Sequence, residues 1–255
     1  MKILKVLTLI IALSVLTIAC GSSGGGGGGG DTTETVIALK TDVLRTESQG
    51  DTWTYSGSGT VTNGSNTVDI SGTVNFQVLS GTKTSPITGF TSLDKYSVIN
   101  LSTPTGPLVV SVHIYFYQDV DGTMYVDGQS SDSGDIWVTS PVQGFYLSME
   151  SPVSVGQNYS SSVTYDDGSS ATYATSVTGI ENVSTGMGTY EAYRLVTNAT
   201  FYHTNGDRVD EVVTEWHVPG LGSIKAQIDA SYYVGGVYSH SMDLTFTLSS
   251  TSVSY

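Results

Sequence analysis

Alternation of apolar and polar residues is the feature that most restricts how this chain can fold. Between Val68 and Val78 the even-numbered positions are apolar or glycine, and the odd-numbered positions are polar. Successive side chains of a β-strand point to opposite faces, so this pattern predicts a strand with one packed face and one face in water. Further strands are predicted at 52–61, 93–101, 107–118, 123–129, 135–139, 145–150, 159–165 and 171–183. A helical period is lacking, although residues 36–45 could form a short helical turn.

Short strands separated by turns favour an all-β fold, built as a single antiparallel meander that forms a curved sheet or half-open barrel. The alternative is a β-sandwich. Residues 35–255 would form one domain of about 220 residues, a size that all-β domains reach. A seam near Ser151-Pro152 would divide this domain into two similar halves, without a clean sequence repeat.

One predicted hairpin is centred on Asn205-Gly206, a residue pair preferred in two-residue type I′ turns. Such a turn pairs Leu195 with Trp216 and gives the hairpin one apolar face and one mixed, polar face. Trp216 then lies on the apolar face as a large core side chain.

A second predicted hairpin turns near Gly235-Gly236. A two-residue loop would place Ala226 opposite Thr245 and mix the two faces. A three-residue loop over 235–237 instead pairs Ala226 with Phe246, so that small residues face large ones. We therefore predict a three-residue, bulged loop.

Four residues are predicted to gather on the polar face of the first hairpin. Glu211, Glu215 and His217 share one face of their strand, and Arg194 lies opposite His217. Two carboxylates and a histidine are suited to acid–base chemistry or to metal binding. Because Arg194 is their neighbour, a solvated cross-strand charge cluster is the better interpretation. We expect no catalytic residue, no metal ion and no cofactor.

A second group of candidate residues lies on the strand predicted at 107–118. His113, Tyr115 and Tyr117 share one face of this strand, and the residues between them are apolar. Such an aromatic stripe could contact a sugar or a lipid. The competing interpretation is that these rings form the second face of a packed sheet.

The amino terminus has the character of a secretory signal. Two lysines precede an apolar stretch of about 14 residues, which is short for a membrane-spanning helix. The stretch ends in Leu16-Thr17-Ile18-Ala19-Cys20, which resembles the lipobox of bacterial lipoproteins. The resemblance implies that residues 1–19 are removed as a signal peptide and that Cys20, the single cysteine, becomes lipidated.

We interpret residues 20–34 as the lipidated Cys20 followed by a flexible tether. Seven consecutive glycines cannot bury apolar surface, so this segment is expected to stay flexible. Among Gram-negative lipoproteins an aspartate after the cysteine favours retention at the inner membrane. Gly21 stands at that position, so the resemblance implies the outer membrane, with the domain facing the periplasm or the cell surface. Removal of the signal peptide leaves seven basic and 23 acidic residues, and a net charge of −16 instead of −14.

Two further segments carry a resemblance in the body of the chain. Gly188-Thr189-Tyr190 leads into a strand, and a second segment runs from Trp216 through Pro219-Gly220 to Lys225. Together they resemble a segment of bacterial lipoproteins and periplasmic β-proteins, and they are similar to the lipoprotein carriers of the outer-membrane sorting system. The resemblance implies a curved sheet or half-open barrel and implies no particular activity.

The composition of the chain excludes some classes of protein and favours others. Nine basic residues against 23 acidic residues argue against nucleic acid as a partner, and one cysteine excludes a disulfide scaffold. We expect a membrane-tethered, non-enzymatic lipoprotein that binds a hydrophobic ligand in a concave sheet or supports envelope assembly. A surface adhesion or glycan-binding module is the alternative. A hydrolase is the least favoured function, because the Gly-x-Ser-x-Gly match at residues 21–25 lies in the glycine-rich tether and forms no nucleophile elbow.

Overall fold

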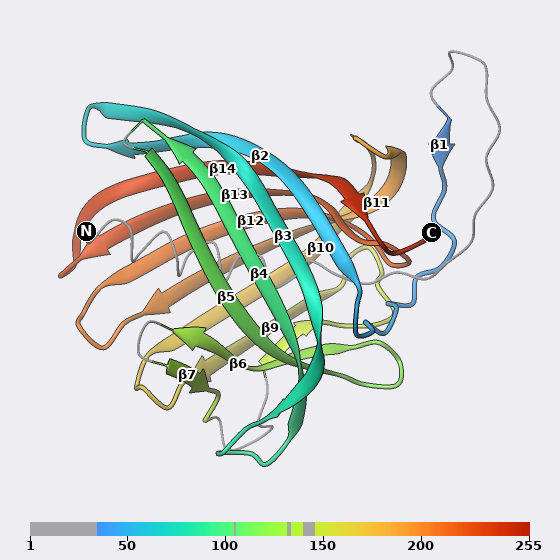
Figure 1. Ribbon diagram of the computed structural model, residues 1–255, viewed down its shortest axis with the longest axis horizontal. Helices are drawn as coiled ribbons and strands as arrows, with labels where there is room; N and C mark the ends of the chain where they lie inside the picture. Colours follow the sequence, from blue (N-terminus) through green and yellow to red (C-terminus); the bar gives the residue numbers. More distant parts are fainter. Residues whose placement is uncertain (1–34, 105, 132–133, 140–145) are drawn as a thin grey trace.

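The computed structural model describes residues 35–104, 106–131, 134–139 and 146–255 (Figure 1). The predicted signal peptide, Cys20 and the glycine tract lie outside the described residues. All regular secondary structure in the described part is β-strand. None of these residues forms a helix long and apolar enough to cross a membrane.

The described residues form 14 strands of one sheet. In chain order the strands are β1 (Val36–Ile37), β2 (Thr52–Asn63), β3 (Asn66–Thr84), β4 (Thr91–Thr103), β5 (Gly106–Gln118), β6 (Met124–Ser131), β7 (Gly134–Trp137), β8 (Tyr146–Met149), β9 (Asn158–Thr164), β10 (Ser170–Thr185), β11 (Gly188–Tyr202), β12 (Arg208–Val218), β13 (Gly222–Val234) and β14 (Val237–Thr251). Each strand predicted from alternation is present, whereas the short helical turn is absent and β1 lies in its place.

The order across the sheet is β7-β6-β5-β4-β3-β2-β14-β13-β12-β11-β10-β9. Neighbours along this path are antiparallel; β8 also pairs antiparallel with β6, whereas β1 adds to β11 in parallel. The all-β antiparallel meander is therefore confirmed, and the single sheet rules out the sandwich alternative. The predicted seam near Ser151-Pro152 falls between β8 and β9, and the strands on either side of it meet again where β2 pairs with β14.

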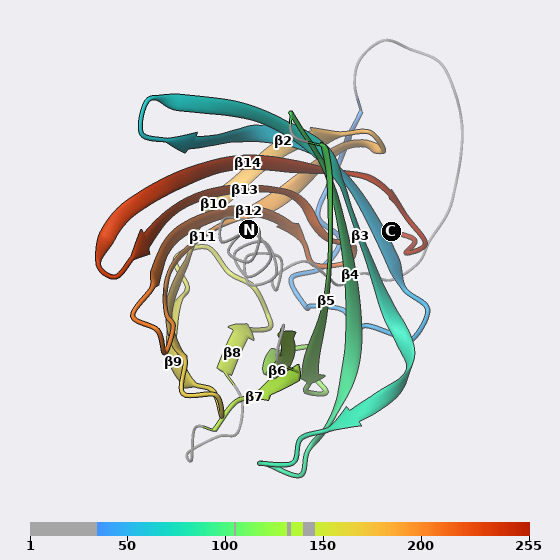
Figure 2. The ribbon, with the colours of Figure 1, turned by 60° about the vertical axis from the view of Figure 1, so that its left-hand side comes forward.

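The sheet curls around an interior but does not close into a barrel (Figure 2). The outer strands β7 and β9 approach each other only at one end, where Val138 and Tyr165 form an isolated antiparallel bridge. Beside this bridge the Thr139 N–H donates to the Thr164 carbonyl at 2.8 Å. The half-open form predicted from the sequence is the observed one.

Glycines allow β2 and β3 to bend sharply. A Cβ added to Gly59 would overlap the carbonyl group of Asp243 on β14, and one added to Gly72 would overlap that of Asn100 on β4. Both obstacles are backbone atoms of the neighbouring strand, so no side-chain rotation can relieve the overlap. A glycine in a strand interior often marks such a close approach of two backbones.

The inner face of the sheet carries the core. Trp53 and Tyr55 of β2 are fully buried, and both reach across to the segment that begins β13. The Trp53 Nε1–H donates to the Leu221 carbonyl at 3.1 Å, and the Tyr55 hydroxyl donates to the Ser223 carbonyl at 2.8 Å. One cluster of buried apolar side chains includes residues of both halves of the sheet.

A segment without regular structure, residues 38–51, crosses one end of the sheet, and we call it the strap. The Arg45 N–H donates to the Pro219 carbonyl at 3.2 Å, and the Glu47 N–H donates to the Gln118 side chain at 2.7 Å. The Gly50 N–H donates to the Val78 carbonyl at 2.8 Å. The strap is therefore bonded to the turn after β12, to β5 and to β3, which belong to both halves of the sheet.

The register predicted for the first hairpin is wrong by one residue. Leu195 pairs with Glu215 and not with Trp216. The His203 N–H donates to the Asp207 carbonyl at 2.9 Å, which closes a loop of three residues from Thr204 to Gly206. Gly206 supplies the positive φ of 84° at the third loop position, as in a type I turn followed by a left-handed residue. A one-residue shift moves every side chain of a strand to the other face.

The second hairpin has the predicted pairing but a different turn. Ala226 lies opposite Phe246 as expected. The loop itself has only two residues, Gly235-Gly236, with φ values of 56° and 82°. The extra residue is taken up by a β-bulge opposite Tyr232 and Tyr233 and not by the loop, which restores the same register further along the strands.

Candidate functional site

A row of ionisable side chains lies on the inner face of β12. Glu211, Glu215 and His217 share this face, as predicted, but they are only 3%, 2% and 0% exposed. The interpretation of these residues as a solvated charge cluster is therefore wrong. The cause is the one-residue shift in the hairpin, which turns this row into the interior.

Arg194 does not belong to the row. It pairs with Trp216, which places both residues on the opposite, outer face of the hairpin. There the Arg194 guanidinium lies 3.6 Å from a Glu181 carboxylate oxygen, and the Trp216 Nε1–H donates to Glu181 at 2.8 Å. The ammonium of Lys225 lies 4.6 Å from the centre of the Trp216 ring. Trp216 thus remains buried, but on the face opposite to the predicted one.

The two carboxylates of the row have different surroundings. Glu211 lies between Ala199 on β11 and Ala230 on β13. Glu215 lies between Leu195 and Ala226, and one of its oxygens is 3.4 Å from His217 Nδ1. The cross-strand neighbours of Glu211 are thus both small, whereas Glu215 has one large neighbour, Leu195.

Other polar side chains face the interior from β9 to β11. Tyr159, Thr175 and Thr197 are neighbours in one cross-strand row, and the two threonine hydroxyls are 2.9 Å apart. Burial, and after it the Glu215 carboxylate, raise the pKa of Tyr159, and the same two causes raise the pKa of Tyr55. Glu215 therefore lies close enough to influence both phenols.

His217 retains an unused hydrogen-bonding atom. Its Nε2 is buried and has no partner among the described residues. The Ser161 hydroxyl is likewise buried without a hydrogen-bond partner among the described residues. Buried polar atoms without a partner are uncommon in native structures, and each calls for water, an ion or a ligand as an explanation.

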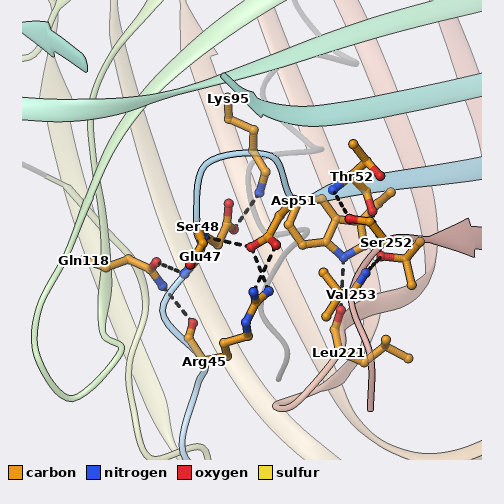
Figure 3. Close-up of polar contacts among 12 residues, drawn as sticks. Arg45, Glu47, Ser48, Asp51, Thr52, Lys95, Gln118, Leu221, Ser252 and Val253 are labelled. Carbon is orange, nitrogen blue, oxygen red and sulfur yellow. Dashed lines mark hydrogen bonds and ion pairs between the residues drawn. The ribbon is translucent and has the colours of Figure 1, made fainter. Parts of the chain in front are cut away.

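A buried ion pair fastens the strap to the inner face (Figure 3). The Lys95 ammonium lies 2.8 Å from a Glu47 carboxylate oxygen, and the two side chains are 2% and 0% exposed. Lys95 also lies 5.2 Å from the ring centre of Trp53 and 5.6 Å from that of Phe116. Burial raises the pKa of Glu47, an effect that Lys95 partly opposes.

The aromatic candidates on β5 lie on the outer face and each meets an aspartate. His113 Nδ1 is 2.9 Å from Asp94, the Tyr115 hydroxyl donates to Asp135 at 2.6 Å, and the Tyr117 hydroxyl donates to Asp119 at 2.9 Å. Tyr115 is only 1% exposed because Trp137 stacks on it at 4.8 Å between ring centres. His113 and Tyr117 are the partly accessible members of this group.

Asp127 is a buried carboxyl that the sequence analysis did not single out. It occupies a β-bulge of β6 and accepts hydrogen bonds from Ser92 at 3.2 Å and Thr88 at 3.4 Å. Burial raises the pKa of Asp127 to about 6, although both hydroxyls oppose this effect.

We expect this carboxyl to make stability depend on pH. The folded-state pKa of Asp127 exceeds the unfolded value, so its stabilising contribution is present at pH values below about 4 and is lost as the pH rises through 6. Asp127→Asn removes this dependence. The unfolding free energy of the variant minus that of the original chain should therefore rise by about 2 kcal/mol from pH 4.5 to pH 7. Urea denaturation at both pH values measures this, and an unchanged difference would contradict it.

The outer face also holds a depression of about 560 Å³ on the C-terminal half. Asp210, Asp229 and Asp243 are among its lining residues, and Asp229 lies directly opposite Asp243. Burial and the Asp243 carboxylate raise the pKa of Asp229. No group of three or more His, Cys, Asp or Glu side chains within the described ranges is arranged to hold a metal ion.

Sequence reasoning named the β12 row but missed the buried ion pair of Lys95 and Glu47. Lys95 offered a usable signal, because it occupies an inner position in the alternation with Leu93 and Ile99. A lysine at such a position predicts a buried acidic partner. Glu47 offered none, because it lies in the strap, where no periodic pattern indicates which side chains are buried.

Comparison with known proteins gives limited similarity. No protein-family model and no curated protein sequence matches the chain. A solved structure from Parabacteroides distasonis ATCC 8503, provisionally described as a lipoprotein, is 12% identical with a TM-score of 0.38, over 84% of this chain and 99% of that one. Another, from Bacteroides fragilis NCTC 9343, is provisionally described as an exported protein with a YmcC-like fold. It is 10% identical with a TM-score of 0.40, over 82% of this chain and 98% of that one.

Proposed function

We propose that this protein is a membrane-tethered, non-enzymatic lipoprotein whose curved sheet binds a hydrophobic ligand. The observation that carries the proposal is an apolar inner surface in a sheet whose outer strands β7 and β9 stay apart along most of their length. The apolar surface, which we call the apolar wall, is the inner face of β13, β14 and β2 to β5. It includes Ile228, Leu244, Phe246, Val74, Phe76 and Ile99.

The tether is the second part of the proposal. The lipobox resemblance at Cys20 supports attachment through acyl chains, and more than one chain gives stable anchoring. With a net charge of −16 after signal removal, the protein surface would be repelled by anionic lipids, so the acyl groups would provide the attachment. Gly21 supports the outer membrane as the site of attachment.

The first test is whether the protein carries lipid. The mature chain with Cys20→Ala, secreted behind an unrelated cleavable signal, is expected to copurify with extractable apolar molecules, because the apolar wall favours their transfer out of water. Mass spectrometry of an organic extract detects them. A folded protein that yields no such molecule, and takes up no fluorescent acyl probe, would contradict the proposal.

Glycan contact on the outer face remains the second candidate, and one observation favours it. The rings of Phe90, Tyr117 and Tyr125 follow one another at 6.5 Å and 6.4 Å between centres, and Phe90 and Tyr117 are 47% and 36% exposed. Exposed rings beside carboxylates such as Asp119 suit a neutral sugar. Binding on a glycan array that is lost in Tyr117→Ala would support this function.

A further inference from the structure

Two cavities adjoin on the outer face of the C-terminal half of the sheet. The depression of about 560 Å³ crosses β11 to β14 and β2. A second cavity, of about 450 Å³, lies over β9 and β10 and reaches Tyr202 at the end of β11. Thr172 lines the second cavity and Thr200 lines the first, and these two residues are direct partners across β10 and β11. We call the two cavities together the outer groove.

The floor of the outer groove is a polar row that runs across the strands. Each member is the direct partner of the next on the neighbouring strand, and each lines one of the two cavities. From β9 to β2 the row is Ser162, Thr172, Thr200, Asp210, Ser231, Ser241 and Thr62. All but Asp210 carry a hydroxyl group. Neighbouring strands are about 4.8 Å apart, so the row spans about 29 Å across the sheet (Figure 1).

Tyrosine rings border the outer groove on the side of the hairpin loops. Tyr202 is 47% exposed, and its cross-strand row continues through Arg208 to Tyr233, whose ring centre lies 4.3 Å from the Arg208 guanidinium. The ring of Tyr238, also 47% exposed, lies 6.0 Å from that of Tyr233. A tyrosine combines an apolar ring face with a polar hydroxyl, which suits the C–H face and the hydroxyl groups of a sugar.

Carboxylates border the groove on the other side. Asp229 and Asp243 are exposed and lie opposite each other, and no side chain among the described residues donates a hydrogen bond to either. Ionised carboxylates only accept hydrogen bonds, so both are available to the hydroxyl groups of a ligand. Their charge disfavours an anionic ligand. Asp210 is already occupied, because Arg208 lies 2.9 Å from it and the Thr200 hydroxyl donates to it at 3.2 Å.

We propose that the outer groove binds a linear, uncharged polysaccharide chain that lies across the strands from β9 to β2. Serine and threonine hydroxyls both donate and accept, so they can match sugar hydroxyls in either role. One sugar unit of an extended β-1,4-linked chain is about as long as the spacing between strands, so successive sugars meet successive members of the row. A cationic peptide would meet mainly neutral hydroxyls and only two unpaired carboxylates.

This binding does not rest on the hydrophobic ligand proposed above, because the groove lies on the outer face. It also differs from the ring series of Phe90, Tyr117 and Tyr125, which belongs to the N-terminal half of the sheet. The two surfaces can therefore be tested separately.

The test is calorimetric titration of the mature chain with Cys20→Ala. The probes are four neutral β-1,4-linked hexasaccharides, namely those of glucose, mannose, xylose and N-acetylglucosamine, together with the trisaccharide of each. At least one hexasaccharide is expected to bind, at least about tenfold more tightly than its trisaccharide, because the shorter chain covers fewer members of the row. Hexagalacturonate and hexalysine provide the anionic and the cationic comparison, and both are expected to bind more weakly.

Variants then locate the chain. Tyr202→Ala is expected to weaken hexasaccharide binding about tenfold, and Asp229→Asn about threefold, because each removes a contact on one side of the groove. Ile180→Ala is the matched control, since Ile180 of β10 is also 47% exposed but lines neither cavity. It should leave the affinity unchanged.

Each contrary outcome overturns the inference. If none of the hexasaccharides binds at millimolar concentration, the groove is not a glycan site, whereas extraction of apolar molecules from the interior would remain a separate result. Tighter binding of hexalysine would show that the groove is an acidic docking surface. If Tyr117→Ala abolishes hexasaccharide binding and Tyr202→Ala does not, the glycan lies on the ring series of the N-terminal half.

Discussion

Replacing Lys95 with alanine is expected to lower the free energy of unfolding by about 3–5 kcal/mol. The substitution leaves the Glu47 carboxyl buried without its cation, and it removes the ammonium that lies near the rings of Trp53 and Phe116. Losing one partner of a buried pair costs far more than the pair itself contributes. Urea denaturation followed by tryptophan fluorescence measures the effect.

Two comparisons make this prediction specific. Arg194→Ala breaks the partly exposed pair with Glu181 and should cost no more than about 1 kcal/mol. The double variant Glu47→Gln, Lys95→Met removes both charges and should recover most of the stability that Lys95→Ala loses. Equal losses in Lys95→Ala and Arg194→Ala would show that the pair is not buried as described.

Alanine at Gly59 or at Gly72 is expected to destabilise the fold by about 2–4 kcal/mol. The new Cβ would overlap a carbonyl group of the neighbouring strand, so the backbones of the two strands would have to move apart. Such a movement would flatten the sheet where β2 and β3 bend. Chemical denaturation of each variant measures the loss.

Gly179 provides the matched control for this pair. It also lies in a strand, β10, but a Cβ added there meets no atom within 4 Å, and its φ is not in the left-handed range. Gly179→Ala should therefore change the unfolding free energy by less than about 1 kcal/mol in either direction. If Gly59→Ala were equally mild, close approach of the strands would not be what selects glycine.

The strands could be predicted from the sequence because alternation is a local signal. The register of the first hairpin could not, because β12 carries apolar residues on both faces, with Val209 and Val213 on one and Val212 and Trp216 on the other. Either register therefore buries apolar side chains. The loop around Gly206 decided between them, and Asn-Gly at its centre favoured a two-residue turn that the chain does not adopt.

The candidate site was affected directly by that shift. The three residues of the β12 row were correctly placed on one face, but the side of the sheet that this face would line depended on the turn. In the hairpin at Gly235-Gly236 the predicted loop length was wrong but the predicted strand pairing was right, because a bulge compensates for the shorter loop. Register predictions from turns are thus sensitive to bulges, which leave little trace in a single sequence.

The pairing of β2 with β14 has a consequence for how the chain acquires its structure. The Thr251 hydroxyl donates to the Thr52 carbonyl, two residues 199 positions apart. Until β14 has been synthesised, β2 presents an unpaired edge to other chains, and such edges are prone to aggregation. Contacts between distant positions also slow the search for the native state. The sheet can therefore be completed only after nearly all of the chain has been synthesised.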